Sequence, residues 1–147
     1  MFEFNNSSLE KFYAKFNQLN NNPEVKVIPI IIDSFGGHAH TLLSMLDIIQ
    51  TAEKPVATIA RGKAMSCGAF LLAAGTKGYR FAAPMSDIMI HEVSSMEWGK
   101  TTNLVSDVKR TKQLNDDLFK DFAKKAGKKD REFFLKELRK RVNVDWY

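Results

Sequence analysis

Residues 56–75, VATIARGKAMSCGAFLLAAG, join an apolar strand pattern directly to an apolar helix pattern. Residues 56–60 are rich in apolar and β-branched side chains, which is typical of a buried strand. Residues 67–75 are apolar and end in glycine, which predicts a short buried helix. We interpret the polar segment between them, residues 61–66, as a turn.

The sequence before this stretch shows the same alternation of helix and strand. Apolar residues recur at helical spacing near the N-terminus, and residues 5–8 offer polar side chains that can cap that helix. VKVIPIIID, residues 25–33, is typical of a strand in a parallel sheet, although Pro29 removes one ladder donor. After the glycine pair at 36–37, a second helix is predicted by apolar residues that share one face: Leu42, Leu43, Leu46 and Ile49.

After residue 75 the pattern predicts short strands at residues 79–84 and 87–93, a long helix over 102–126 and a last helix over 130–141. Gly127 stops the long helix. We expect its apolar face to contain Leu104, Val108, Leu114, Leu118, Phe122 and Ala126. Strands that alternate with helices predict an α/β fold with a mainly parallel sheet.

Composition favours a soluble, cytoplasmic protein with one domain. The chain has 147 residues, 44% of them hydrophobic and 27% charged, and no apolar run approaches the ~20 residues that span a bilayer. The N-terminus does not resemble a signal peptide, and the single cysteine, Cys67, fits a reducing compartment. The net charge of +5 is concentrated near the C-terminus, where a solvated helix end is favoured over a nucleic-acid patch.

Two residues are candidates for acid–base and nucleophilic chemistry. Ser66 lies where a strand becomes a helix, with Ala64 and Gly68 as small neighbours, so its hydroxyl suits a nucleophile turn or, alternatively, a helix cap. His91 follows a strand pattern, at the end of the sheet where ligand sites of α/β proteins gather, and is either a base or a structural histidine.

The remaining histidines and glycines allow two readings each. His38 and His40 could begin a metal site, but no third ligand stands at suitable spacing, so we expect no metal. Gly36 and Gly37 form either a simple strand-to-helix turn or a loop whose N–H groups face a developing oxyanion.

Residues 30–126 resemble the proteolytic subunit of the ATP-dependent Clp protease. The resemblance rests on IIIDSFGG (30–37), on GKAMSCGAFLLAAGTKGYRFAAP (62–84), on IMIHEV (88–93) and on the long helix. It implies a spiral of β-β-α units in a single domain over residues 1–147. This domain would comprise a head at about 1–100, a handle helix at about 102–126, and a C-terminal helix with a short tail at 127–147.

The resemblance also implies roles for individual residues. Ser66 matches the nucleophile and His91 the base, while the backbone N–H groups of Gly37 and Cys67 match the oxyanion donors. Asp145 matches the acid of the triad. Other aspartates fit less well: Asp130 suits a helix cap, Asp87 should point away, and Asp33 should be structural.

This family hydrolyses peptide bonds in peptides or unfolded proteins through an acyl-enzyme and needs no cofactor. The resemblance further implies a homo-oligomer, as heptameric rings that can stack, and an AAA+ Clp ATPase as partner, with no nucleic acid and no membrane. Phe35 replaces the family's proline before the glycine pair. The family's opening axial loop and its segments beyond the acid are absent here, so we expect a shortened, phage-type member or part of a gene product.

Three other functions compete with this expectation. The first is a catalytically inactive or regulated subunit of the same family, which a poorly anchored Asp145 would favour. The second is an acyl-CoA enzyme of the related crotonase superfamily, which shares the spiral and the paired amides but does not rely on a serine–histidine pair. The third is a basic nucleic-acid binder.

Overall fold

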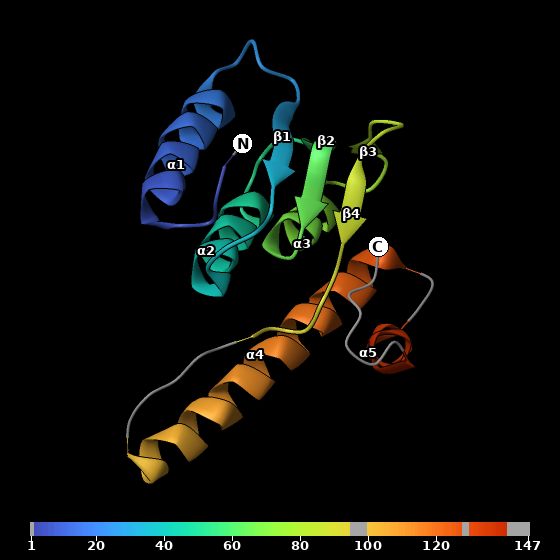
Figure 1. Ribbon diagram of the computed structural model, residues 1–147. Helices are drawn as coiled ribbons and strands as arrows, with labels where there is room; N and C mark the ends of the chain where they lie inside the picture. Colours follow the sequence, from blue (N-terminus) through green and yellow to red (C-terminus); the bar gives the residue numbers. More distant parts are fainter. Residues whose placement is uncertain (1, 95–99, 128–129, 141–147) are drawn as a thin grey trace. The chain divides into compact units, whose positions relative to one another are not determined.

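The computed structural model describes residues 2–94, 100–127 and 130–140 (Figure 1). It falls into two compact units, the first ending at Ile90 and the second beginning at His91. The expectation of a single domain stays a prediction. Within the described residues, no helix combines the length and the apolar character that crossing a membrane requires.

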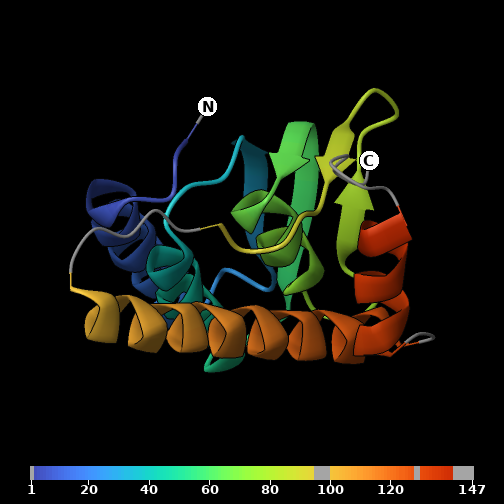
Figure 2. The ribbon, with the colours of Figure 1, turned by 60° about the horizontal axis from the view of Figure 1, so that its bottom comes forward.

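The first unit is a parallel sheet with helices. Its elements are α1 (Asn6–Asn21), β1 (Ile28–Ser34), α2 (Ala39–Gln50), β2 (Val56–Met65), α3 (Cys67–Ala73), β3 (Arg80–Ala82) and β4 (Asp87–Met89). Strand β2 is central: it pairs in parallel with β1 on one side and with β3 and then β4 on the other. Helix α3 packs against β1, β2 and β3, and α2 packs against α3 (Figure 2). The predicted α/β fold with a parallel sheet is confirmed.

Strand β1 alternates buried and exposed side chains, and its isoleucines at 28, 30 and 32 belong to the core. Pro29 does not break the ladder, because the Ile28 N–H donates to the Pro55 carbonyl at 2.9 Å. Since successive N–H groups of a strand point to opposite sides, the nitrogen of Pro29 faces the outer edge of β1 and not β2.

Strand β2 is longer than the sequence predicts. The prediction of a turn over residues 61–66 is wrong for 61–65, which continue the strand to Met65. Pairing explains the difference: Lys63, Ala64 and Met65 lie in register with residues 87–89 of β4, which holds this polar segment extended. The turn is therefore confined to Ser66.

Helix α1 begins as the sequence predicts. The Asn5 side chain accepts a hydrogen bond from the Ser8 N–H at 2.9 Å, and the Ser8 hydroxyl accepts one from the Asn5 N–H at 3.0 Å. This reciprocal capping box satisfies two N–H groups that a bare helix end leaves unpaired.

The second unit contains α4 (Thr101–Ala126) and α5 (Arg131–Lys140), so the predicted long helix is confirmed. Phe122 of α4 meets Phe134 of α5 edge to face, with ring centroids 5.0 Å apart. Along the predicted apolar face of α4, Leu118 is buried, whereas Val108 is 65% exposed, because α5 contacts the C-terminal part of α4.

Candidate active site

Ser66 has an unusual backbone conformation at the junction of β2 and α3. Its φ is +54° and its ψ is −121°, and it is the one non-glycine residue with positive φ among those described. A helix-capping serine normally has extended backbone and accepts a hydrogen bond through its side chain. The Ser66 side chain makes no such bond, so it does not cap α3.

Hydrogen bonds on both sides hold Ser66 in this conformation. Its N–H donates to the Met89 carbonyl of β4 at 2.9 Å, and its carbonyl accepts from the Ala69 N–H of α3 at 3.0 Å. Such backbone conformations cost about 1–3 kcal/mol and are found where surrounding structure imposes them, often at active sites. A half-buried serine on a sharp strand-to-helix turn presents its hydroxyl in the manner of a nucleophile.

Gly36 lies directly against Ser66. A Cβ at Gly36 would stand 2.7 Å from the Ser66 Cβ and 3.1 Å from the Ser66 Oγ, and φ at Gly36 is +111°. The Gly36 N–H donates to the hydroxyl of Ser34, which is fully buried, at 3.0 Å. Only glycine fits at this position, and the Ser34 hydroxyl holds the Gly36 N–H in place.

Gly37 is held by the N-terminal segment of the chain. The Phe4 N–H donates to the Gly36 carbonyl at 2.9 Å, and the His38 N–H donates to the Phe4 carbonyl at 2.8 Å. A Cβ at Gly37 would lie 2.6 Å from that carbonyl oxygen, so this position also requires glycine. The pairing uses groups of residues 36 and 38, and no hydrogen bond between described residues uses the Gly37 N–H.

Cys67 connects the glycine loop to α3. Its Sγ donates to the Gly37 carbonyl at 3.3 Å, and the side chain is 5% exposed. Burial raises the pKa of the Cys67 thiol, which keeps the proton that this bond needs. As the first residue of α3, Cys67 has a backbone N–H without an intrahelical acceptor. Ser66, Gly36, Gly37 and Cys67 are thus brought together within the first unit.

His91 is half-buried and is the first residue of the second unit. The two residues after it are anchored by Asn115 of α4: the Val93 N–H donates to Asn115 Oδ1 at 3.0 Å, and Asn115 Nδ2 donates to Glu92 Oε1 at 3.4 Å. Asn115 is 8% exposed. Sequence reasoning missed both Asn115 and Ser34, and no apolar or helical pattern around either residue signals its role.

The predicted acid, Asp145, lies outside the described residues. The other aspartates have the structural roles that the sequence favoured. Asp130 caps α5 by accepting from the Phe133 N–H at 2.8 Å, and Asp87 is exposed at the start of β4. Asp33 accepts a hydrogen bond from the Lys63 ammonium at 2.6 Å.

The Asp33–Lys63 pair sits beside the glycine loop. Lys63 Nζ also lies 4.5 Å from the centroid of the Phe35 ring, within the range of a cation–π contact. The hydrogen bond from Lys63 is the main cause that lowers the pKa of Asp33 from its usual 3.8. His38 and His40 are exposed, and the described residues contain no cluster of three side chains that could hold a metal ion.

The family model described as Clp protease matches residues 2–142, nearly the whole chain. The chain belongs to the Clp protease family. Membership indicates a peptidase of the ClpP type and, for this family in general, an oligomeric ring that works with a Clp ATPase. In this Clp protease-family protein, the match includes the Ser66 turn, the glycine pair and the segment 88–93.

Replacing Gly36 by alanine tests the contact with Ser66. We expect Gly36→Ala to lower the free energy of unfolding by about 1–3 kcal/mol more than Gly78→Ala, because the added methyl group meets Ser66. Gly78 is the matched control: its φ is +89°, and a Cβ there meets nothing within 4 Å. Urea unfolding measures both variants, and equal losses would contradict the close packing described for Gly36.

The Asp33–Lys63 pair predicts a pH dependence of stability. Because the folded-state pKa of Asp33 is lowered, the pair stabilises the protein above the unfolded-state pKa, and this contribution is lost as pH falls through the folded-state pKa. Between pH 6 and pH 3 the wild type should therefore lose more stability than Asp33→Asn. Urea midpoints across this range measure the difference. Parallel curves for the two proteins would show that Asp33 is not perturbed.

Proposed function

We propose that the protein is a serine endopeptidase subunit in which Ser66 is the nucleophile. The observation that carries the proposal is the conformation of Ser66: a serine at φ +54° with no capping bond, packed against Gly36. A structural serine at a helix start would not need this strained backbone. Membership in a peptidase family supports the interpretation of this conformation as that of a nucleophile.

In the first half of the reaction, Ser66 Oγ attacks the carbonyl carbon of a peptide bond while His91 takes the hydroxyl proton. The carbonyl oxygen becomes an oxyanion, which accepts hydrogen bonds from the backbone N–H groups of Gly37 and Cys67. The carbon–nitrogen bond then breaks, and the proton on His91 passes to the leaving amine. An acyl group remains on Ser66.

In the second half, a water molecule attacks this acyl group and gives a proton to His91. The ester bond breaks, the proton returns to Ser66 Oγ, and the carboxylic acid leaves. Asp145 would orient His91 and stabilise its charged form during both halves. Loss of one oxyanion donor typically costs about 10²–10³ in rate.

Strand register supports His91 as the base. Met65 pairs with Met89, so Ser66 is one residue, and His91 two residues, beyond a paired position at the same edge of the sheet. Parallel strands bring the residues that follow them to one edge, where α/β proteins gather their functional side chains. His38 also follows a strand paired at this end, since Ser34 pairs with Ala64, but it is four residues beyond that pair, and His40 belongs to α2.

The substrate is proposed to be an extended peptide or unfolded protein segment that adds its backbone beside residues 37–40 or 92–95, of which residue 95 lies outside the described residues. We further propose a homo-oligomer of heptameric rings, which stack through α4 and work with an AAA+ Clp ATPase. Val105 and Val108 of α4 are 52% and 65% exposed, which favours a contact with another chain. Cys67, the single cysteine of the chain, is buried and free, which fits the reducing cytoplasm as the proposed location.

A fluorophosphonate probe tests the nucleophile. Wild-type protein should be labelled on Ser66, Ser66→Ala should not be labelled, and His91→Ala should be labelled about 10²–10⁴-fold more slowly because the general base is lost. Lys77→Ala, at an exposed position between α3 and β3, is the control and should be labelled at the wild-type rate. Intact-mass spectrometry measures the adduct.

The other outcomes separate the competing functions. No labelling of wild type in any assembly state would indicate the inactive, structural subunit. Saturable binding of an acyl-CoA without hydrolysis of peptides would indicate a crotonase-type enzyme. Salt-dependent binding of nucleic acid alone would indicate the basic binder.

Assembly through α4 gives a second prediction. Introducing charge at both exposed valines, Val105→Glu with Val108→Glu, should halve the mass of a stacked double ring of 16.7 kDa chains, because apolar contact area is replaced by repelling carboxylates. Arg110→Glu, exposed on the opposite face of the same helix, is the control and should keep the wild-type mass. Light scattering coupled to gel filtration measures the mass. Equal masses for all three proteins would exclude α4 as the contact.

A further inference from the structure

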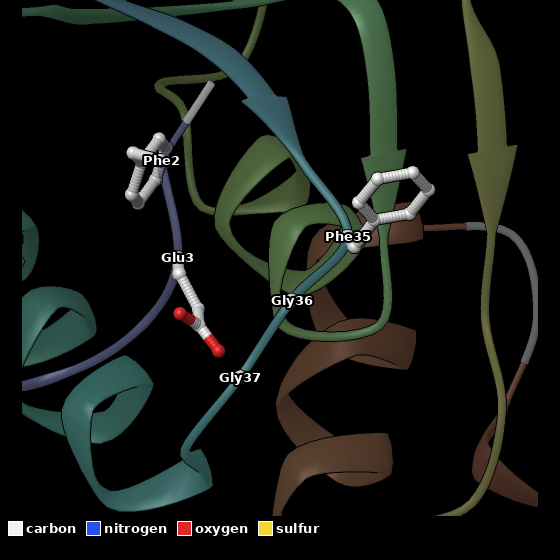
Figure 3. A pocket seen from close by; sticks show the side chains of 5 residues that line it. All are labelled: Phe2, Glu3, Phe35, Gly36 and Gly37. Carbon is white, nitrogen blue, oxygen red and sulfur yellow. The ribbon is translucent and has the colours of Figure 1, made fainter.

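A cavity of about 520 Å³ opens beside the glycine loop in the first unit. It is lined by Phe2 and Glu3 of the N-terminal segment and by Phe35, Gly36 and Gly37 of the loop. Figure 3 shows the Glu3 carboxylate turned toward the backbone of Gly37, with the Phe2 and Phe35 rings on opposite sides of this space. Its volume is within the range of about 300–1,000 Å³ that is usual for ligand pockets.

Among the residues that line the cavity, Glu3 is the charged one. Among the described residues, no hydrogen bond or ion pair is recorded for the carboxylate of Glu3, which is exposed. Asp33, the other acid near the loop, is already paired with Lys63 at 2.6 Å. The Lys63 ammonium binds Asp33 and also lies 4.5 Å from the centroid of the Phe35 ring, so Glu3 is the carboxylate beside the loop that a positively charged group from outside can reach.

Gly36 and Gly37 connect this cavity to the candidate nucleophile. Gly36 lines the cavity, and a Cβ placed on it would lie 3.1 Å from Ser66 Oγ. Gly37, which also lines it, is the proposed oxyanion donor. In an extended peptide, neighbouring residues are only about 3.3 Å apart along the chain. Because Glu3 and Gly37 line the same cavity, a side chain next to a substrate carbonyl bound at the Gly37 N–H can enter the space that Glu3 lines.

We propose that this cavity binds a lysine or arginine side chain of the peptide substrate next to the scissile bond, with Glu3 as the residue that determines this specificity. The inference rests on the proposed peptidase function. Lysine and arginine have apolar stems that can lie along the Phe2 ring, and a cationic end that the Glu3 carboxylate attracts. Acidic substrate side chains are repelled by Glu3 in the same position.

Internally quenched peptides test the preference. A set of peptides of equal length carries lysine, glutamine or glutamate in turn at each of the two positions on either side of the scissile bond. At one of these positions, wild type should cleave the lysine peptide about two- to five-fold faster than the glutamine peptide, the range expected of an exposed ion pair. The glutamate peptide should be slowest, and high salt should reduce the preference.

Two variants assign the preference to Glu3. In Glu3→Gln the ratio of lysine to glutamine rates should fall to about 1, and in Glu3→Lys the order of lysine and glutamate peptides should reverse. Glu24→Gln is the matched control: Glu24 is exposed and precedes the start of β1, whereas Glu3 lies beside the loop after its end. This control should keep the wild-type ratio.

Labelling of Ser66 by the fluorophosphonate probe is measured on every variant and separates the two proposals. If Ser66 is labelled and peptides are cleaved, but Glu3→Gln keeps the wild-type ratio or wild type shows no preference for lysine, the cavity proposal is overturned and the peptidase stands. If wild type is neither labelled nor active on any peptide, both proposals are overturned. Labelled Glu3 variants with changed ratios exclude misfolding as the cause.

Discussion

The hydrogen bond from the Ser66 N–H to the Met89 carbonyl fixes the point at which β2 ends, and the candidate site depends on it. Register with β4 keeps residues 63–65 extended, so the chain must reverse at one residue before α3 begins. That constraint imposes a positive φ on a serine. If this strand contact were absent, Ser66 could relax to the extended backbone of an ordinary helix cap. The strain is therefore a property of the sheet and not of the turn alone.

Backbone groups, and not large side chains, shape the loop that faces Ser66. The Ser34 hydroxyl holds the Gly36 N–H, Phe4 pairs with the residues on both sides of Gly37, and the Cys67 thiol holds the Gly37 carbonyl. Each contact fixes a different atom of the same short segment. As a result the segment around the Gly37 N–H is fixed, while no hydrogen bond between described residues uses this N–H. An oxyanion donor requires both conditions.

The sequence predicts what local patterns determine and misses what distant contacts determine. Apolar periodicity located the helices and β1, because burial of one face repeats at the spacing of the element. The extension of β2 to Met65 was missed because it depends on pairing with β4, which lies more than twenty residues later. Periodicity does not tell which part of the apolar face of α4 is buried, because a helix face becomes buried only where a partner covers it, and Val108 stays exposed. Ser34 and Asn115 act through contacts that no local pattern encodes, while the family resemblance, and not periodicity, identified the proposed roles of His91 and Asp145.

The outer edge of β1 shows how the fold limits unwanted association. An open strand edge is a template on which other chains can add strands and aggregate. Near Asp33 this edge is occupied by residues 2–4, whose Phe2 N–H donates to the Asp33 carbonyl at 3.0 Å. Further along the edge, Pro29 presents a ring nitrogen without a hydrogen. A strand added to this edge would lack a hydrogen-bond donor at Pro29, and the carbonyl of Asp33 already accepts from Phe2. Copies of this chain should therefore resist joining edge to edge into larger sheets.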